Sequence, residues 1–401
     1  MTSFSCTKTL CNRILLTFET VPPPTASNRA YSVNETQAPR LSICIPTLNR
    51  GGFIGETLQS IVSQATDEVE IVIVDGGSTD ETQAVVAHFQ ALFPRLRYFR
   101  KHEREVTAKS ASPSGGGFDR DCNRAVELAE GEYCWLFTDD DLLKPGAVQA
   151  VLHATRDRYA LIVVNAEVRS GDLSRSLDPS RLRLASDRTY QPEESQKLFV
   201  EVANYLSFVG GIVIKRQLWL ARDKQPYIGT GFIHVGVLLQ SPISEQTLVI
   251  AEPLITIRYG DALYMRSSRY FEIWMFLWPN LVWSFPDFSD AAKLLVSRRE
   301  PWRRYRTLLL FRAKGAYSAK EYRDWLEGRL GSQSDKMCAR LLASCPGSIA
   351  NLISFVYYYA SGRHDLLLIL DLMKSPFYFA RALKSPVPIQ KTGTVPKTAS
   401  I

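Results

Sequence analysis

Several signatures that commonly identify a class of enzyme are missing from this 401-residue sequence. It has no CxxC pair, and its seven cysteines and five histidines show no zinc-type spacing, so we predict reduced thiols and no metal–thiolate site. Neither a G-x-G-x-x-G fingerprint nor a P-loop is present, which argues against a dinucleotide-binding or P-loop NTPase fold. We find no internal repeat and no low-complexity tract.

Long hydrophobic runs are also scarce. Residues 341–362 form the one long stretch without charge, but it contains Pro346, Gly347 and Asn351, and it predicts a packed or interfacial helix. A single membrane span is the alternative. Residues 1–40 lack the apolar core of a signal peptide, and we expect a disordered extension there.

The composition is ordinary for a globular protein, with 45% hydrophobic and 22% charged residues. The net charge of +7 favours an anionic partner, such as a diphosphate, an anionic membrane surface or nucleic acid. Charge alone does not choose among these.

Short apolar runs alternate with helical patterns through the first two thirds of the chain. Strands are expected at 41–46, 69–75, 96–99, 132–137, 161–167, 207–215 and 248–259, and helices at 53–64, 81–93, 118–129 and from Pro145 onward. The polar stretch 170–187 is expected to be a loop. This order predicts an α/β fold with a mostly parallel sheet and helices on both faces, followed by a helical, aromatic and basic region.

Acidic residues stand directly after two of these strands. Asp75 ends the second one, and Asp139, Asp140 and Asp141 follow the run 132–137. Ligands of such sheets bind at the carboxyl ends of the strands, and adjacent carboxylates are stable when a hard cation such as Mg²⁺ or Mn²⁺ neutralises them. The alternatives are a helix N-cap for Asp141 and an Asx turn for Asp75.

At this point the sequence resembles a known family. Its motifs are Ile45–Arg50 (IPTLNR), Ile71–Thr82 (IVIVDGGSTDET), Ala125–Tyr133 and Leu136–Asp141 (LFTDDD). Together they cover about residues 41–155 and resemble a family 2 glycosyltransferase with the GT-A fold. Shorter motifs at 131–136, 208–211 and 232–234 are similar to the bacterial abequosyltransferase subgroup.

The resemblance implies an architecture and a reaction. We expect a Rossmann-like GT-A domain with a nucleotide-sugar-binding half at 41–155 and an acceptor-binding half at 156–262, before a helical region at 263–401. The implied reaction moves a sugar from a nucleotide-sugar donor to a hydroxyl of a glycan or lipid-linked glycan. It would be inverting, would depend on Mn²⁺ or Mg²⁺, and would serve bacterial surface polysaccharide or O-antigen synthesis.

The resemblance also implies site residues. Candidates for contact with the donor are Pro46, Thr47, Asn49, Arg50, Asp75, Asp119, Arg120 and Asp139, and candidates for the metal are Asp139, Asp140 and Asp141. The family often writes the metal motif as Asp-x-Asp, and Thr138 takes one of the possible first positions here. The division of roles within the triplet is therefore open. An ion pair at the surface fits Asp119 and Arg120 equally well.

The acceptor side lacks an expected group. Family members usually supply a carboxylate as general base, but the matching stretch 229–234 contains none, and His234 is the candidate instead. A metal ligand and a buried structural histidine are its other possible roles, and Glu201, Asp223 and Asp261 are weaker substitutes as base. Two alternatives thus stay open: a catalytically impaired GT-A module that binds nucleotide sugars, and a polyprenyl-phosphate sugar transferase.

The C-terminal region adds a basic and aromatic segment at 298–314. Its basic residues are Arg298, Arg299, Arg303, Arg304, Arg306, Arg312 and Lys314. Their interleaving with apolar residues suits an anionic membrane surface, and a solvated helix packed on the domain is the alternative. No nucleic-acid-binding module accompanies them, so we expect no nucleic-acid partner. The expected location is cytoplasmic, with a peripheral position on the inner face of the cell membrane as an option.

Overall fold

The computed structural model describes residues 38–101, 116–260, 267–360 and 366–380. The extension predicted to be disordered, residues 1–40, lies almost wholly outside these residues. Everything below concerns the compact unit that starts at Ala38. Of the seven cysteines, the five described ones are free thiols, and three of them (Cys44, Cys122 and Cys134) are buried.

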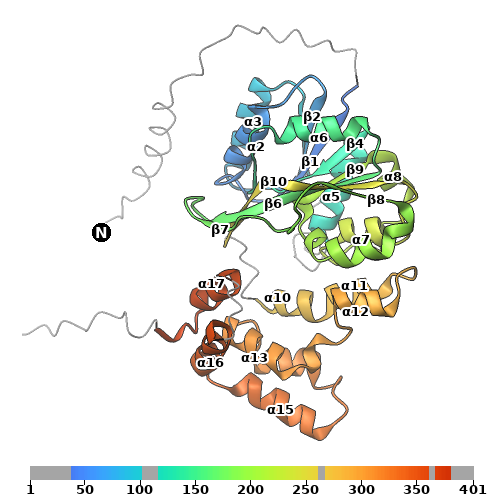
Figure 1. Cartoon of the computed structure of the whole chain (residues 1–401). Coiled ribbons are helices and arrows are strands. Elements are labelled where there is room, and N and C mark those ends of the chain that lie inside the picture. Colours follow the sequence, from blue (N-terminus) through green and yellow to red (C-terminus); the bar gives the residue numbers. More distant parts are fainter. Residues whose placement is uncertain (1–37, 102–115, 261–266, 361–365, 381–401) are drawn as a thin grey trace, which may run out of the picture. The chain divides into compact units, whose positions relative to one another are not determined.

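One ten-stranded sheet organises the first two thirds of this unit (Figure 1). Its strand order is β3-β2-β1-β4-β9-β6-β10-β5, with β7 paired to β6 and β8 paired to β10. The strands are β1 (Leu41–Thr47), β2 (Val69–Asp75), β3 (Leu96–Arg100), β4 (Tyr133–Leu136), β5 (Leu142–Leu143), β6 (Leu161–Ser170), β7 (Ser176–Asp178), β8 (Arg188–Tyr190), β9 (Ile212–Lys215) and β10 (Thr247–Tyr259).

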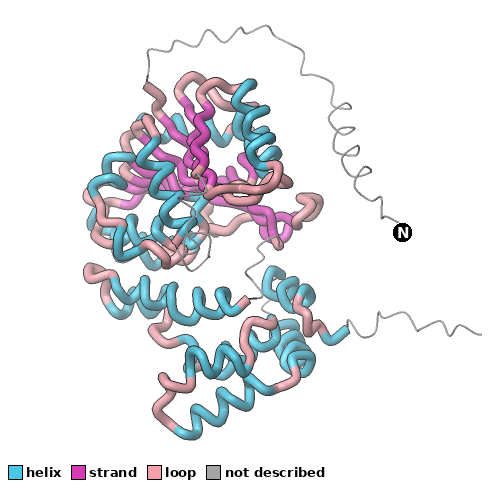
Figure 2. Tube along the Cα trace, turned by 180° about the vertical axis from the view of Figure 1, so that it is seen from behind, coloured by secondary structure: helices cyan, strands magenta, loops and turns pink. Residues whose placement is uncertain are grey.

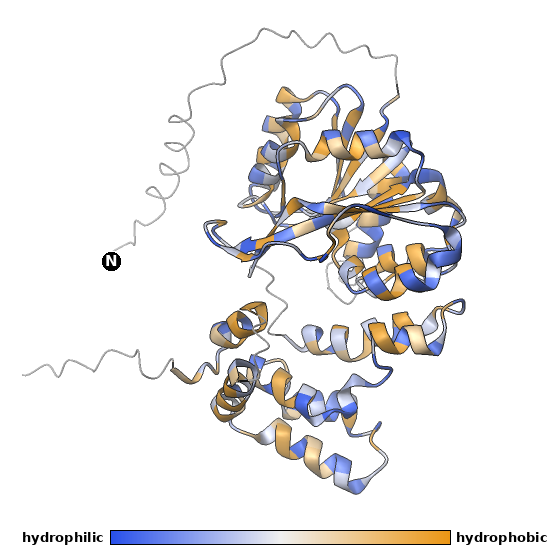
Figure 3. Ribbon diagram, viewed as in Figure 1, coloured by the Kyte–Doolittle hydropathy of each residue, from blue (hydrophilic) through white to orange (hydrophobic). Residues whose placement is uncertain are grey.

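The three longest strand pairings in the sheet are parallel. Strands β3, β2, β1 and β4 run parallel to one another, as do β6 and β10, while β9 lies antiparallel between β4 and β6. Helices cover both faces, and the apolar colouring is concentrated in the central strands (Figures 2 and 3). The predicted fold class is confirmed. Both β1 and β2 are buried along their whole length, which explains why they read as continuous apolar runs.

Seven α-helices accompany the sheet in the described residues. They are α2 (Ile54–Val62), α3 (Thr82–Leu92), α5 (Gly117–Leu128), α6 (Ala147–Arg156), α7 (Ser195–Val202), α8 (Arg216–Ala221) and α9 (Ile233–Leu239). Helix α5 packs against β1 and β2, and both α8 and α9 contact it. Its amino end and the start of α9 therefore meet close to the carboxyl ends of those strands.

Three local predictions are wrong in detail. The expected loop 170–187 contains β7, whose residues find hydrogen-bonding partners on β6. The expected strand 207–215 is a strand only from Ile212, because Val209–Gly211 forms a 3-10 turn in which a Cβ at Gly210 would lie 2.4 Å from the Phe208 ring. Helix α6 starts at Ala147, after Gly146 in a left-handed conformation, rather than at Pro145.

The C-terminal region is helical, as predicted. Its helices are α10 (Ser268–Glu272), α11 (Trp278–Ser284), α12 (Asp290–Val296), α13 (Tyr305–Lys314), α14 (Ala319–Glu321), α15 (Gln333–Ser344), α16 (Gly347–Ala360) and α17 (Leu366–Lys374), with π-helical turns after α10 and α14. One hydrophobic core includes buried residues from Leu41 to Ile255 and continues into α11 and α12, while α13 to α17 pack in separate clusters. Hydrogen bonds from Tyr259 to Leu367 and from Arg269 to Gly229 join the two regions.

Candidate functional site

Asp75 closes β2 and organises the turn that follows it. Its Oδ1 accepts hydrogen bonds from the backbone N–H of Gly77 (2.8 Å) and Ser78 (2.7 Å) and from the Ser78 hydroxyl, and its Oδ2 accepts one from the Tyr98 hydroxyl (2.5 Å). Gly77 has a φ of 105°, a conformation that favours glycine. Asp75 is completely buried and thus shapes the loop as an Asx turn. A contact with the nucleotide base stays a prediction.

The IPTLNR motif attaches the end of β1 to this turn. Pro46 and Thr47 pair with Val74 and Asp75 in the parallel register, which places both strand ends at one edge. Asn49 adopts a positive φ of 55°, and its side-chain oxygen accepts from the backbone N–H of Thr79 (2.8 Å). The motif therefore builds the wall of the edge. Direct contact of Pro46, Thr47 and Asn49 with a donor stays a prediction.

Arg50 holds the first two aspartates of the acidic triplet. Its Nε donates to Asp139 Oδ1 (3.1 Å), and its Nη2 donates to Asp140 Oδ2 (2.6 Å). The Arg50 side chain is only about a quarter exposed, so it lies within the site and not on the outer surface. Burial raises the pKa of Asp139 to about 6, and the positive charge of Arg50 opposes that rise. The two carboxylates thus converge on one cation.

Asp141 has different partners. Its Oδ1 accepts from the backbone N–H of Arg258 on β10 (2.8 Å), and its Oδ2 accepts from the Thr138 hydroxyl (2.6 Å). Burial and the neighbouring Asp140 raise its pKa. Asp141 therefore joins the end of β4 to β10, 117 residues later in the chain. It is also not the N-cap of α6, since that position belongs to Gly146.

These contacts test how a divalent cation would fit. No group of three or more His, Cys, Asp or Glu side chains in the described ranges is arranged to hold a metal ion. Asp139 and Asp140 nevertheless both direct a carboxylate oxygen, a hard ligand, at the Arg50 guanidinium, which supplies the positive charge between them. They fit a cation that takes its other ligands from a diphosphate and water. Both oxygens of Asp141 are committed to the protein, so it fits that role less well.

Asp119 and Arg120 differ in environment. Arg120 is exposed, whereas Asp119 is buried and accepts backbone N–H bonds from Gly229 (2.7 Å), Gly231 (2.9 Å) and Ile233 (3.2 Å). Asp119 thereby satisfies donors at the start of α9 from a distant part of the chain. Its surroundings match neither a surface ion pair nor an exposed phosphate ligand. The predicted diphosphate contacts of both residues stay predictions.

His234 lies one residue into α9 and is buried. In the described structure neither ring nitrogen makes a hydrogen bond of good geometry, although the backbone of Ser207 and Leu206 lies near enough to affect its charge. Burial lowers the pKa of His234 to about 4. The ring lies edge-on to Phe118, at 6.4 Å between centroids. It is thus a neutral imidazole with unused hydrogen-bonding capacity.

The sequence reasoning missed other polar residues near this edge. Lys101 forms an ion pair with the buried Asp121, and a Cβ at Gly76 would lie 3.0 Å from Asp121 Oδ2. Arg258 also donates from its Nε to the backbone oxygen of Asp140 (3.1 Å). Arg258 stands near the end of β10, within the stretch 248–259 that was predicted as a strand plus connection, so the rule about strand ends would have found it. Asp121 lies within a helix and carries no such signal.

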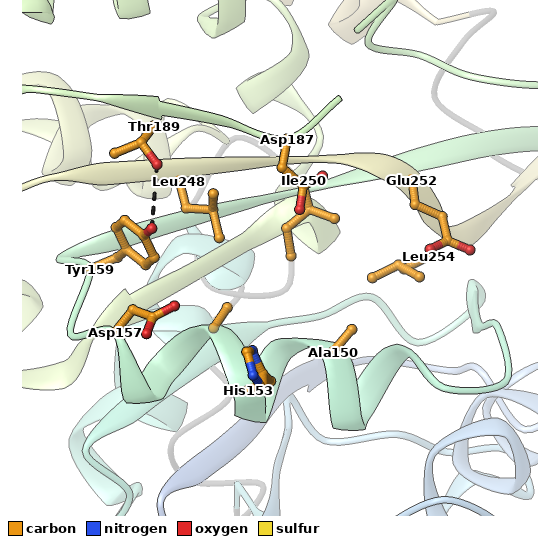
Figure 4. A pocket seen from close by; sticks show the side chains of 11 residues that line it. Ala150, His153, Asp157, Tyr159, Asp187, Thr189, Leu248, Ile250, Glu252 and Leu254 are labelled. Carbon is orange, nitrogen blue, oxygen red and sulfur yellow. Dashed lines mark hydrogen bonds between the residues drawn. The ribbon is translucent and has the colours of Figure 1, made fainter. Parts of the chain in front are cut away.

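A cavity of about 440 Å³ lies elsewhere, between α6 and the strand β10 (Figure 4). Its lining includes His153, Asp157, Tyr159 and Glu252, and the Tyr159 hydroxyl lies 3.3 Å from that of Thr189. None of the predicted site residues lines it. This cavity is therefore separate from the acidic edge.

Comparisons with known proteins agree with the geometry. Residues 42–211 match the model of Glycosyl transferase family 2. Abequosyltransferase RfbV of Salmonella typhimurium is 27% identical over 242 residues, which cover 57% of this chain and 69% of that protein. A GalNAc(5)-diNAcBac-PP-undecaprenol β-1,3-glucosyltransferase of Campylobacter jejuni is 28% identical over 37% of this chain, and the match spans 45% of that relative's length.

Among solved structures, the UDP complex of TarS from S. aureus superposes with a TM-score of 0.50 at 16% sequence identity. The match covers 83% of this chain and 88% of that one. At this sequence identity, the match shows similarity of fold alone. Over residues 42–211, this chain thus contains a glycosyltransferase domain of family 2 with the GT-A fold.

Proposed function

We propose that the chain transfers a sugar, with inversion and in the presence of Mn²⁺ or Mg²⁺, from a nucleotide sugar to a hydroxyl of a glycan or lipid-linked glycan in bacterial surface polysaccharide synthesis. The observation that carries this proposal is the convergence of Asp139 and Asp140 on the Arg50 guanidinium, at the end of β4 and beside the Asp75 turn. The relative whose name includes a PP-undecaprenol-linked glycan supports the lipid-linked acceptor class.

On the donor side, the residues would bind and orient. Asp139 and Asp140 would hold the divalent cation, which when bound neutralises the diphosphate leaving group. Arg50 is positioned to move its charge from the carboxylates to a phosphate oxygen, because its guanidinium can form two hydrogen bonds with either partner. The Asp75 turn and Asn49 keep the loops at this edge in place.

On the acceptor side, His234 would accept the proton of the attacking hydroxyl at one ring nitrogen. Its low pKa keeps the imidazole neutral at pH 7, and neither nitrogen is committed to a well-formed bond within the described chain. Access requires Phe118, which is exposed, or the loop before α9 to move. Asp119 is a positioning residue, since it holds the backbone that carries His234.

Thermal-shift measurements with UDP-, GDP-, CDP- and dTDP-sugars in the presence of Mn²⁺ test the donor, because a ligand that binds only the native state raises the melting temperature. We expect one nucleotide class to stabilise the wild type and to lose its effect in Asp140→Asn. Stabilisation by no donor, or one that survives both Asp140→Asn and removal of Mn²⁺, would contradict the proposal.

Arg50→Met gives a second test that does not measure activity. Without the guanidinium, the two carboxylates lack their compensating charge, so we expect Mn²⁺ to bind the donor-free protein about tenfold more tightly. The same variant should bind the nucleotide sugar more weakly. Electron paramagnetic resonance of free Mn²⁺ and calorimetry measure the two effects. An unchanged Mn²⁺ affinity would place the cation elsewhere.

A catalytically impaired binding module is the second candidate, and the missing acceptor-side carboxylate favours it. Turnover by the wild type separates the two functions, because an impaired module would bind the donor without transfer, and His234→Gln then tests the base. Loss of transfer with unchanged donor binding and an unchanged melting temperature supports the enzyme. Unchanged turnover in that variant would remove His234 from the reaction.

A further inference from the structure

Helix α16 is packed with its small and polar residues inward and its large apolar residues outward. Its buried residues are Gly347, Ala350, Asn351 and Ser354. Ile349, Leu352, Ile353, Val356 and Tyr359 lie between 43% and 63% exposed. Their spacing of three and four residues places most of them on one face. A helix that faces water normally shows the opposite arrangement.

Hydrogen bonds fix this orientation. The Asn351 side chain donates to the backbone oxygens of Ala313 on α13 (3.2 Å) and Leu372 on α17 (2.9 Å), and the Ser375 hydroxyl also donates to Ala313 (2.7 Å). Close packing through small residues, with an amide joining the helices, is how helices associate where the surroundings are apolar. These contacts fix the rotation of α16 about its axis, and its apolar side chains are therefore held outward.

Two large apolar residues of the preceding helix α15, Met337 and Leu341, are also exposed. In the described chain no single helix is long and apolar enough to cross a membrane, and the pair α15–α16 is bent by 99°. Helix α16 alone has 14 residues, or about 21 Å at 1.5 Å per residue, against a hydrocarbon thickness of about 30 Å. Its length suits a helix that lies in a membrane interface. The apolar colouring of α16 and α17 can be followed in Figure 3.

Arg306 borders this face, and two further exposed arginines lie on α15 and at the start of α13. Arg306 stacks over the Tyr357 ring, with its guanidinium carbon 5.5 Å from the centroid, and donates to the Tyr357 hydroxyl (3.3 Å). Arg340 is exposed next to Leu341, and Arg304 is exposed at the start of α13. Helix α16 itself has no charged residue. An apolar face with tyrosine and arginine at its border complements anionic lipid head groups above an acyl layer.

We propose that the outer face of α15 and α16, consisting of Met337, Leu341, Ile349, Leu352, Ile353, Val356 and Tyr359, docks on an anionic bilayer. The sequence predicted that residues 298–314 contact the membrane with both basic and apolar side chains. The proposal assigns the apolar contact to α15 and α16 instead. Leu308 and Phe311 of α13 are buried, so this segment supplies charge while α16 supplies the apolar contact. The proposal is independent of the proposed sugar transfer.

Flotation of the full chain with vesicles tests it. We expect the wild type to float with phosphatidylcholine–phosphatidylglycerol vesicles (3:1) and much less with phosphatidylcholine alone. The double variant Ile353→Ser/Val356→Ser should reduce the partition coefficient at least about tenfold, because two apolar side chains no longer enter the acyl boundary. Arg304→Gln/Arg306→Gln should reduce it about tenfold for the anionic vesicles, and high salt should do the same.

The matched control is Leu294→Ser/Leu295→Ser on α12, where two leucines are 53% and 72% exposed. It should bind vesicles like the wild type. Because all four apolar positions are exposed, the melting temperature of each variant should match that of the wild type. Absence of wild-type flotation, or equal flotation of the α16 variant, overturns the proposal. So does self-association of the wild type that Ile353→Ser/Val356→Ser abolishes without changing flotation, because a second copy would then cover the face.

Discussion

The proposed donor and acceptor sides of the candidate site differ in how their titratable side chains are hydrogen-bonded. On the donor side, Asp75, Asp139 and Asp140 are surrounded by N–H and O–H donors and by one guanidinium. On the acceptor side, His234 sits among aromatic rings, and its nitrogens have no well-formed hydrogen bond in the described structure. The proposed donor side thus surrounds its carboxylates with groups that suit a charged ligand. The proposed acceptor side holds an uncharged imidazole without such partners in the described structure.

Removing the Asp75 carboxylate should have the largest effect. Asp75→Ala leaves two backbone N–H groups and two hydroxyls without their buried acceptor, so we expect the free energy of unfolding to fall by about 4 kcal/mol or more. Urea denaturation measures it. Asp67→Ala, an exposed aspartate just before β2, is the control and should change stability little. A loss below about 1 kcal/mol would mean that the turn does not depend on Asp75.

Asp140→Asn should affect catalysis and leave the fold largely intact. With a neutral amide in place of one carboxylate, we expect transfer to fall at least about 100-fold, equivalent to about 3 kcal/mol of transition-state stabilisation. Initial rates over a range of Mn²⁺ concentrations measure the change, with Asp67→Asn as control. Stability should change far less than in Asp75→Ala. If it falls as much, the contrast between a structural and a functional carboxylate is wrong.

The acceptor side predicts a pH dependence of stability. The folded pKa of His234, about 4, lies below the unfolded value of about 6.5, so the unfolded state binds more protons between these values. The contribution of His234 to the free energy of unfolding is therefore fully present above pH 6.5. It decreases as the pH falls towards 4, by about 3 kcal/mol at most. His234→Gln should flatten this part of the pH profile, whereas the exposed His153→Gln should not. Equal slopes for His234→Gln and the wild type would show that His234 is not buried as neutral imidazole.

The smallest expected effect concerns the link between the two sides. Asp119→Asn keeps the helix but weakens the acceptor of three N–H bonds, so the loop before α9 should lose about 1–2 kcal/mol of local stability. Hydrogen exchange of the Gly229, Gly231 and Ile233 amides measures it directly. Glu127→Gln on the same helix is the control. Unchanged protection of these amides would show that Asp119 does not position His234.

Much of the donor side could be predicted because its signals are local. Apolar runs identified β1 and β2, and the rule about strand ends placed Asp75 and the acidic triplet at one edge. The entry to β9 was less predictable, because the turn at Gly210 depends on the Phe208 ring and on a hydrogen bond from Trp135 to the Gly210 backbone oxygen. A pattern in a short window cannot show such contacts.

The sequence by itself determined the strands, their order of appearance and the acidic residues at their ends, because side-chain periodicity and turn chemistry act over a few residues. Only the tertiary structure decided how those residues are used. Arg50 reaches Asp139 and Asp140, Arg258 engages Asp141, and Asp119 holds the loop before His234, each across 89 residues or more. The outward orientation of the apolar face of α16 also depends on tertiary contacts, because the Asn351 side chain donates hydrogen bonds to backbone oxygens of α13 and α17. These contacts depend on which segments the fold brings together.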